Sequence, residues 1–348
     1  MKILHVISSL EIGGAQRLLS DLIPIQKQQG LEVSLLVNEP VRNEFTDKVE
    51  KAGVRIISLD NPRYNSPKNI LLIRKIIKDY DVVHVHLFPS LYWVALASIG
   101  LGVKLVYTEH STSNRRRDKN YLRPVERFIY NRYDRIIAIS KQTKDALQKW
   151  LEAADARFAV INNGVDTKAF SDKRRPVVPK SLIMVSRFVA SKDQETVIKA
   201  LGHLDDDVTL RLVGEGANME HCKIVAQQAG VADRVSFLGS RSDIAELIAE
   251  SYIGIQSSNW EGFGLTAVEL MAAGKPVIVS DVDGLKQVVE GAGETFRRGD
   301  ERDLAAKISR LLDSRTLYDD VARKCQERAG RYDISVMAEK YRAIYDTL

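Results

Sequence analysis

Apolar, β-branched runs alternate with stretches of helical spacing along most of the chain. Seven runs in the first half have the length and composition of buried strands: Lys2–Ile7, Val33–Val37, Arg55–Leu59, Val82–His86, Leu105–Thr108, Arg135–Ile139 and Phe158–Ile161. Between several of them, apolar residues recur every three or four positions, as in 15–29, 69–78 and 142–150. This alternation predicts a parallel sheet with helices on both faces.

The alternation stops at the polar stretch 166–180, which we interpret as a linker, and then resumes. Five further strands are predicted at 182–186, 209–213, 235–238, 253–256 and 276–280, and residues 303–348 have helical spacing throughout. A chain of 348 residues therefore predicts two doubly wound, Rossmann-like α/β domains, 1–165 and 181–330, followed by a helix at 331–348. Ligands of such sheets bind beyond the carboxyl ends of the strands, so two facing sheets would hold a substrate cleft.

Composition narrows the class of protein. A hydrophobic fraction of 45% and a charged fraction of 28% are typical of an ordinary folded protein. The two cysteines, Cys222 and Cys325, support neither a disulfide framework nor a zinc site. The N-terminal run lacks a secretory pattern, and we expect the uncharged stretch 87–103 to be a buried helix rather than a transmembrane one. A cytoplasmic location fits these features.

Charge is distributed unevenly along the chain. Residues 1–165 carry 25 basic and 17 acidic side chains, a net charge of +8, whereas residues 166–348 carry 26 and 29, a net charge of −3. The basic excess is concentrated in segment 115–135, where cations alternate with aromatic and aliphatic residues. Such a segment suits an anionic membrane surface and equally suits a solvated loop and helix. No nucleic-acid partner is expected.

The segment from Trp260 to Ser280 carries the strongest chemical signal. It reads W-E-G-F-G-L-T-A-V-E-L-M-A-A-G-K-P-V-I-V-S and places Glu261 and Glu269 around a turn that begins a helix. Ionised carboxylates only accept hydrogen bonds, so two of them suit a ligand rich in hydroxyl groups. The free N–H groups in the first turn of a helix suit a phosphate. The segment thus offers complementary chemistry for a sugar, a ribose and a phosphate.

Two cations follow the first predicted strand of the second domain. Arg187 ends that strand and Lys192 lies on the following loop, so both are expected at the carboxyl edge of the sheet. A pair of cations there can bind a pyrophosphate and stabilise it as it leaves. Two solvated cations are the alternative.

The first domain offers weaker candidates. Gly13 and Gly14 lie in the loop after the first strand, where glycines allow backbone contact with a ligand or simply a tight turn. His110 follows the strand at 105–109, where it can bond a sugar or assist an acceptor hydroxyl. His84 and His86 share one face of their strand, but no third metal ligand is close in sequence, so we expect packing roles.

Signatures of metal and dinucleotide sites are weak or absent. The pair Asp205 and Asp207 falls at the amino end of a strand, and the pair Asp281 and Asp283 falls in a turn, where aspartate is common for backbone reasons. The full G-x-G-x-x-G fingerprint of dinucleotide-binding domains does not occur after the first strand. We expect no metal site.

Taken together, these residues resemble the retaining glycosyltransferases of family 4, which have the GT-B architecture. The most specific stretch, E-G-F-G-L-T-A-V-E-L-M-A-A-G-K-P-V-I-V-S-D, matches the family's E-x7-E pattern and the strand after it. I-N-N-G-V-D at 161–166 resembles the family's domain junction, and V-S-F-L-G at 235–239 resembles the strand before its nucleotide-base pocket. The resemblance covers nearly the whole chain.

The resemblance implies roles for the charged residues of the second domain. Glu261 would hold hydroxyls of the donor sugar, and Glu269 would accept hydrogen bonds from the ribose. Arg187 and Lys192 would bind the pyrophosphate and stabilise the leaving nucleoside diphosphate. No metal or other cofactor is then required, because the cations and the helix dipole supply the charge stabilisation.

It also implies backbone contacts and a contribution from the first domain. The amides of Phe263, Gly264 and Leu265 would meet the sugar and the phosphate. Gly14 would line the donor site from the first domain, and His110 would lie near the transferred sugar. The helix at 331–348 would cross back to the first domain.

Three positions beside the expected donor pocket depart from the family's pattern. Asp193 stands where the family often has glycine, Asp283 precedes Gly284 where it often has two glycines, and 286–287 reads Lys-Gln where it often has Pro-Glu. The identity of the donor is therefore less specified than the class of reaction.

The resulting hypothesis is a retaining glycosyltransferase that moves a hexose or N-acetylhexosamine from a nucleotide-diphosphate sugar, a UDP-sugar by expectation, to an acceptor hydroxyl. The expected acceptor is a lipid-linked or cell-surface glycan precursor, reached from the cytoplasm or the inner face of the membrane. One alternative is a non-hydrolysing UDP-sugar epimerase of the same architecture, although no matched groups for proton abstraction are evident. Another is a binding module or an NAD-linked enzyme, against which the missing fingerprint argues.

Overall fold

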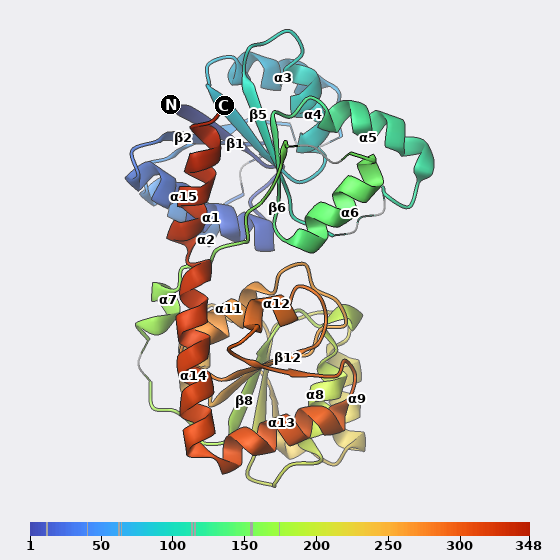
Figure 1. The fold of residues 1–348 in the computed structure, drawn as a ribbon, viewed down its shortest axis with the longest axis vertical. Helices are drawn as coiled ribbons and strands as arrows, with labels where there is room; N and C mark the ends of the chain where they lie inside the picture. The colour runs from blue at the N-terminus through green and yellow to red at the C-terminus, as the bar shows by residue number, and fades with distance from the viewer. Residues whose placement is uncertain are drawn as a thin grey trace. The chain divides into compact units, whose positions relative to one another are not determined.

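A computed structural model describes the chain except for positions 12, 40, 62, 64, 113, 115, 154, 155 and 174. The described residues form two compact units (Figure 1). Unit 1 comprises Met1–Gly164 and Ile334–Leu348, and unit 2 comprises Val165–Asp333. Each unit is built on a parallel sheet flanked by helices, so the expected fold class of two doubly wound α/β domains is confirmed.

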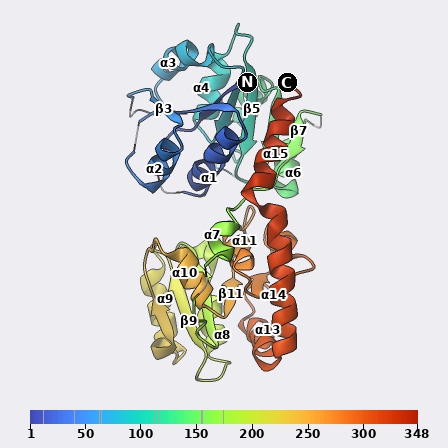
Figure 2. The same ribbon diagram turned by 90° about the vertical axis from the view of Figure 1, so that its left-hand side faces the viewer.

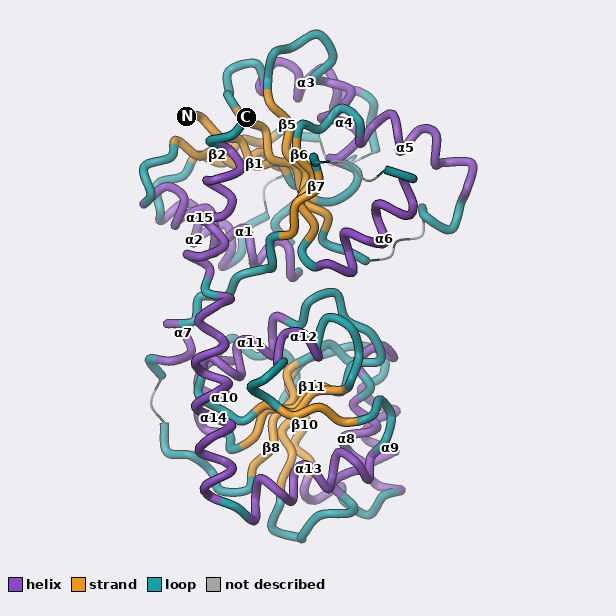
Figure 3. The backbone as a smooth tube through the Cα atoms, viewed as in Figure 1, coloured by secondary structure: helices purple, strands orange, loops and turns teal. Residues whose placement is uncertain are grey.

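The described part of unit 1 contains a seven-stranded sheet in the order β3-β2-β1-β4-β5-β6-β7. Figure 3 shows the strands in orange and the flanking helices in purple. Its strands are β1 (Lys2–Val6), β2 (Glu32–Val37), β3 (Arg55–Ser58), β4 (Val82–His86), β5 (Lys104–Glu109), β6 (Arg135–Ala138) and β7 (Phe158–Val160). Its α-helices are α1 (Gly14–Gln28), α2 (Glu44–Lys51), α3 (Lys68–Ile77), α4 (Ser90–Ala97), α5 (Arg123–Tyr130), α6 (Lys141–Leu151) and α15 (Ile334–Tyr345). The strand order reverses between β1 and β4, the place where doubly wound sheets bind ligands.

Apolar side chains cover both faces of this sheet. One cluster joins the sheet to α1 and α15 through residues such as Ile3, Leu19 and Tyr341. The other lies beneath α3 to α6 and includes Val83 and Leu147. Figure 2 shows α15 beside α1, and the two helices are in contact. The C-terminal helix is therefore part of the core of unit 1.

The described part of unit 2 contains a six-stranded parallel sheet in the order β10-β9-β8-β11-β12-β13. Its strands are β8 (Ser181–Val185), β9 (Thr209–Val213), β10 (Val235–Phe237), β11 (Ile253–Gln256), β12 (Val277–Ser280) and β13 (Glu294–Phe296). Its α-helices are α7 (Lys168–Ser171), α8 (Gln194–Leu201), α9 (Met219–Gln228), α10 (Ile244–Glu250), α11 (Leu265–Ala272), α12 (Lys286–Val289), α13 (Glu301–Asp313) and α14 (Arg315–Ala329). Here the order reverses between β8 and β11.

Residues 166–180, for which the sequence analysis expects a linker, fall within unit 2. They include α7, whose Phe170 is buried. The chain leaves unit 1 after Gly164 and returns to it at Ile334.

No described helix combines the length and apolar character needed to cross a bilayer. The uncharged stretch 87–103 contains α4, whose residues Leu91, Val94 and Ala95 are fully buried. The expected buried helix is confirmed.

Candidate active site

Two loops of unit 2 flank the point at which its strand order reverses. Arg187 and Lys192 lie on the loop between β8 and α8, and Glu261 lies on the loop between β11 and α11. Strands β8 and β11 pair directly, so their carboxyl ends are neighbours. The fold therefore places these three charged residues where ligands of doubly wound sheets bind.

Lys192 and Glu261 form an ion pair in which the ammonium donates to Oε2 of the carboxylate. Both side chains are 20% exposed, so the pair is neither buried in the core nor fully solvated. The second carboxylate oxygen accepts the N–H of Gly262 at 3.1 Å. A bound anion would compete for Lys192, and a sugar hydroxyl would find an oriented carboxylate beside it.

Polar residues directly after β11 connect these two loops. Ser257 Oγ donates to the carbonyl oxygen of Asp193 at 2.7 Å, and Asn259 Nδ2 donates to that of Ala190 at 2.9 Å. The backbone N–H of Asn259 also donates to Ser191 at 2.8 Å. The sequence analysis missed both residues, although a polar triplet following a buried strand was the available signal. These bonds fix the Lys192 loop relative to the Glu261 loop.

The loop carrying Arg187 is held through its backbone. Gln194, which is buried, donates from Nε2 to the Arg187 carbonyl at 2.9 Å and to Ser186 Oγ at 3.0 Å. The Arg187 side chain is exposed, and among the described residues its guanidinium has no hydrogen-bond partner. A fixed backbone with an open guanidinium suits recognition of an anion.

Helix α11 presents its first turn to the same site. Gly264 precedes it with a left-handed φ of +81°, and Leu265 is its first residue. The ring of Phe263 is buried and contacts that of Tyr332 edge to face, so the backbone of this residue is the part left for a ligand. Glu269 is buried on the second turn of α11. The helix start supplies free N–H groups and a positive dipole end.

The Glu261 loop packs closely against Gly284. A Cβ on Gly284 would collide with the carbonyl group of Glu261, and the glycine has a left-handed φ of +88°. The departures from the family pattern build this turn: Asp283 pairs with Lys286 at 2.9 Å, and Gln287 Oε1 accepts the N–H of Gly284 at 2.6 Å. The turn therefore supports the position of Glu261.

Replacing Gly284 with alanine is expected to lower turnover by about tenfold or more, because the new methyl group displaces Glu261 and transfer is sensitive to misplacement of about 1 Å. Gly291 provides the matched control, since its φ is +73° and a Cβ there would have no neighbour within 4 Å. Alanine is strained in the left-handed backbone of both positions, so the two variants differ only in whether Glu261 is displaced. Steady-state kinetics together with melting temperatures separate the two effects. Equal kinetics in the two variants would contradict the supporting role.

The structure also explains why aspartate can stand at position 193, where the family often has glycine. Its backbone is left-handed, with φ +51° and ψ 48°, a conformation that glycine adopts freely and aspartate tolerates. Its carboxylate accepts from Thr196 Oγ1 at 2.7 Å, and burial raises its pKa. The residue thus keeps the turn that glycine would make.

In unit 1, Gly14 and His110 lie at the carboxyl edge of the sheet. Gly14 begins α1 after the β1 loop, is exposed, and would have no neighbour within 4 Å of a Cβ. Packing within the described chain therefore does not explain the glycine. His110 follows β5, is partly buried, and its Nε2 lies 3.1 Å from Nδ1 of His86.

The structure brings a third histidine beside His84 and His86. It is His5, far away in sequence on β1, and ring nitrogens of the three lie within 4.8 Å of one another. No third metal ligand is close to His84 and His86 in sequence, as the sequence analysis states; the pairing of β1 with β4 brings His5 opposite His84 from far along the chain. These nitrogens already hydrogen-bond to one another, to Gln26, to Tyr345 and to Thr108, which accounts for the cluster by packing.

Burial keeps these imidazoles neutral. It lowers the pKa of His5 and of His110 to about 4, and it lowers the pKa of His84 and His86 well below the usual value. Between pH 6.5 and about 4, the unfolded chain therefore takes up protons that the folded chain does not.

Stability should consequently fall as the pH decreases through this window. His5 alone accounts for a loss on the order of 3 kcal/mol by pH 4. Burial raises the pKa of Glu109, so this carboxylate takes up its proton more readily in the folded chain and offsets part of the loss of stability. The effect is measured by unfolding unit 1 with urea at pH 7.5 and at pH 5 and monitoring the unfolding by hydrogen exchange. His221, which lies in unit 2, gives the control: His221→Gln should leave the stability of unit 1 unchanged, whereas His5→Gln should reduce its pH dependence. A stability independent of pH would contradict this account.

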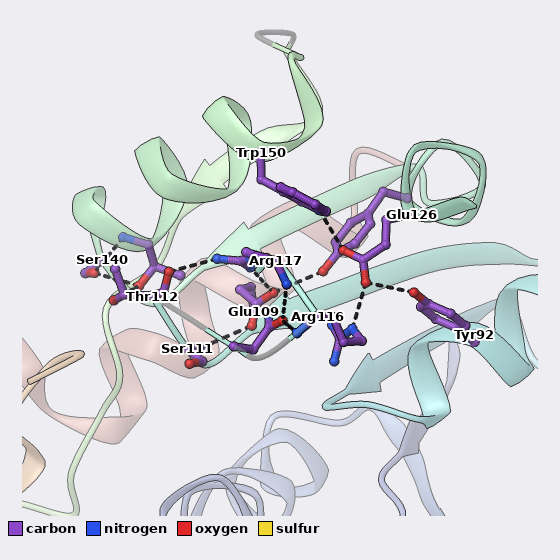
Figure 4. Close-up of polar contacts among 12 residues, drawn as sticks. Tyr92, Glu109, Ser111, Thr112, Arg116, Arg117, Glu126, Ser140 and Trp150 are labelled. Atoms are coloured by element: carbon purple, nitrogen blue, oxygen red, sulfur yellow. Dashed lines mark hydrogen bonds and ion pairs between the residues drawn. The ribbon is translucent and has the colours of Figure 1, made fainter. Parts of the chain in front are cut away.

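The basic segment 115–135 is largely ion-paired in its described part; Arg115 lies outside the described residues. Arg116 Nε donates to Glu126 at 2.7 Å and Arg117 donates to Glu109 at 2.6 Å (Figure 4). Two further arginines of α5, at 123 and 127, share Glu152. In contrast, three apolar side chains of the segment are exposed: Tyr121 (72%), Val125 (48%) and Phe128 (54%).

Comparison with known proteins identifies the family. Residues 12–169 match the family model described as Glycosyltransferase Family 4, and residues 165–330 match that described as Glycosyl transferases group 1. Together the two models cover residues 12–330.

Similar proteins support the same assignment. The chain is 26% identical over 359 residues to phosphatidyl-myo-inositol mannosyltransferase of Mycobacterium leprae, covering 97% of this chain and 93% of that protein. It is 26% identical over 286 residues to N-acetyl-alpha-D-glucosaminyl L-malate synthase of Bacillus anthracis, covering 77% and 75%. The crystal structure of Anabaena HepE in complex with UDP-glucose superposes with a TM-score of 0.85 at 24% identity, covering all of both chains. The chain is a member of the family 4 glycosyltransferases, enzymes with the GT-B fold.

Proposed function

We propose that the enzyme transfers a hexose or N-acetylhexosamine from a UDP-sugar to a hydroxyl of a lipid-linked or cell-surface glycan precursor, with retention of configuration. The observation that carries the proposal is the Lys192–Glu261 pair at the β8/β11 switch point, with Arg187 on the same loop as Lys192. This arrangement offers cations for a pyrophosphate and a carboxylate for sugar hydroxyls. UDP as the nucleotide is supported by the HepE complex, and a lipid acceptor is supported by the name of the mannosyltransferase relative.

The proposed roles rest on the geometry of unit 2 and on the resemblance to the family. Arg187 and Lys192 would bind the pyrophosphate and stabilise the departing UDP, with the amides of 263–265 at the start of α11. Glu261 would bind the donor sugar, and Glu269 would accept hydrogen bonds from the ribose. We propose that Gly14 and His110, at the carboxyl edge of the unit 1 sheet, also take part in substrate binding.

We propose further that no bound metal takes part in the reaction. The cations and the α11 dipole supply positive charge at the leaving group. Transfer should therefore proceed at the same rate in EDTA and in added Mg²⁺. Loss of activity in EDTA that Mg²⁺ restores would contradict this proposal.

A thermal-shift screen of UDP, GDP, ADP and their sugars tests the donor. A ligand that binds the folded state raises the melting temperature according to its affinity, so UDP and one UDP-sugar should give the largest shifts. A larger shift with another nucleotide would overturn the choice of UDP. Incubation with the UDP-sugar alone then separates a transferase, which slowly releases UDP, from the alternative epimerase, which converts the sugar.

We also propose that the acceptor is reached at an anionic membrane, through the exposed face formed by Tyr121, Val125 and Phe128. These residues are spaced by four and three positions and so share one side of α5 and the turn before it. Exposed Lys119 lies next to this face in sequence. Because Arg116 and Arg117 are engaged within the unit, apolar insertion is expected to contribute more than charge.

Vesicle sedimentation tests this face. The double variant Tyr121→Ser/Phe128→Ser should bind anionic vesicles at least several-fold more weakly than the wild type. Ile224→Ser, which removes a 50% exposed apolar side chain of unit 2, should bind as the wild type does. Equal binding of all three proteins would contradict the proposed membrane face.

A further inference from the structure

Four of the six histidines of the chain form a connected cluster inside unit 1. His5 on β1 and His84 and His86 on β4 are fully buried, whereas His110, after β5, is partly buried. The proposed function uses only His110. The proposed function assigns no role to His5, His84 or His86.

Three of these rings and Gln26 form a line of hydrogen bonds. Gln26 Oε1 lies 2.7 Å from His5 Nε2, His5 Nδ1 lies 3.0 Å from His86 Nε2, and His86 Nδ1 lies 3.1 Å from His110 Nε2. In each of these contacts, the Nε2 atom of a histidine faces the oxygen or Nδ1 atom of the residue before it in the line. The line runs from the α1 helix to the carboxyl edge of the sheet.

All hydrogen bonds in this line donate in the same direction, toward Gln26. An amide oxygen only accepts, and a neutral imidazole has one N–H and one lone pair. His5 must therefore donate from Nε2 to Gln26, which leaves its Nδ1 to accept from Nε2 of His86. By the same reasoning His86 accepts at Nδ1 from Nε2 of His110. The remaining Nδ1 of His110 then carries a lone pair.

A second set of bonds accompanies this orientation of Gln26. Its Nε2 donates to the Tyr345 hydroxyl at 3.4 Å, and that hydroxyl lies 2.5 Å from His84 Nδ1. With its oxygen accepting from Gln26, Tyr345 donates to His84, whose Nε2–H then faces Thr108 Oγ1 at 2.7 Å. All four histidines thus share the Nε2–H tautomer, and burial keeps them neutral by lowering their pKa values.

We propose that Gln26, His5 and His86 are positioning residues that hold His110 in the Nε2–H tautomer, so that its Nδ1 accepts a hydrogen bond from a hydroxyl group of the bound substrate. The identity of that substrate rests on the proposed function, whereas the tautomer rests on unit 1 alone. The opposite tautomer would present an N–H to the same hydroxyl and could not accept from it. The buried line of hydrogen bonds therefore determines whether Nδ1 of His110 is an acceptor or a donor at the edge of the sheet.

A matched pair of substitutions at Gln26 tests the proposal in the full-length protein. Gln26→Met and Gln26→Glu both remove the amide donor to Tyr345, but only the methionine removes the acceptor for His5. Nitrogen NMR of histidine-labelled protein reports which ring nitrogen carries the proton. The wild type and Gln26→Glu should show His110 as the Nε2–H tautomer, and Gln26→Met should show a mixture of tautomers.

The same variants should differ in turnover. Gln26→Met is expected to lower kcat roughly three- to tenfold, the effect of one neutral hydrogen bond, and Gln26→Glu should restore most of it. A wild-type His110 protonated at Nδ1, or unchanged tautomers in Gln26→Met, would overturn the proposal, and the wild-type spectrum decides even if the methionine variant does not fold. Because the spectra need no substrate, failure to transfer any sugar would reject the proposed function and leave the tautomer assignment standing.

Discussion

Replacing Lys192 with alanine is expected to lower kcat for UDP release by about a hundredfold or more. The ammonium lies at the switch point of unit 2 in contact with Glu261, where it would meet the charge that develops on the leaving pyrophosphate. Removing one preorganised charged contact of this kind typically costs a factor of a hundred to a thousand. Glu261→Ala should have a similar effect through loss of the sugar contact. Initial rates with the UDP-sugar selected by the thermal-shift screen measure both.

Lys199 provides the matched control for this prediction. It is also a lysine of unit 2 in an ion pair, with Glu195, but its side chain is 47% exposed on α8. Lys199→Ala should leave kcat within about twofold, as expected for a surface pair. Because Lys192 and Glu261 are in contact, the double variant should lose less than the product of the single losses. Near-normal turnover in both single variants, with the fold intact, would refute the assigned roles.

The second large effect concerns the stability of unit 1. Glu126 is fully buried and accepts from Tyr92 Oη at 2.7 Å, Arg116 Nε at 2.7 Å and Trp150 Nε1 at 2.8 Å (Figure 4). Glu126→Ala would leave three donors without an acceptor, one of them charged. Breaking a buried pair in this way costs about 3–5 kcal/mol. Hydrogen exchange of unit 1 under increasing urea is the appropriate measurement, because a chain with two units need not unfold in one step.

Glu152 is the control for Glu126, since it also binds two arginines of the same segment but is 53% exposed. Glu152→Asn suits its left-handed backbone, with φ +51°, and should cost less than about 1 kcal/mol. If Glu126→Ala destabilised unit 1 no more than Glu152→Asn does, the buried cluster would not have the importance that its geometry indicates.

The fold was predictable because period and length are local properties. Strands β4, β9 and β11 begin and end where the apolar runs do. Strand β13 was missed, since its sequence Glu-Thr-Phe contains one apolar residue and so forms no apolar run. Likewise α7 lies in a stretch whose prolines and cations indicated a linker.

The placement of the candidate residues was predictable where their chemistry is carried by neighbours in sequence. The segment containing Glu261 and Glu269 identified the class of enzyme, and position at the end of β8 selected Arg187 and Lys192. The contact between Lys192 and Glu261 spans 69 positions and depends on the pairing of β8 with β11, which periodicity does not specify.

Long-range contacts also explain what was missed in unit 1. The sequence analysis treated His84 and His86 without His5, because strand order decides which histidines meet. It left 115–135 open between a membrane-binding and a solvated segment, because the buried carboxylates that engage Arg116 and Arg117 are identified only by the packing of α5 and β5.

The most direct test of the donor site is calorimetric titration of UDP into the wild type, Arg187→Ala and Glu269→Ala, with Lys199→Ala as the control. The account predicts that the wild type and the control bind UDP alike and that the other two bind at least about tenfold more weakly, because each loses a charged contact to the nucleotide. UDP affinity that is equal in all four proteins would contradict the assignment of unit 2 as the donor site.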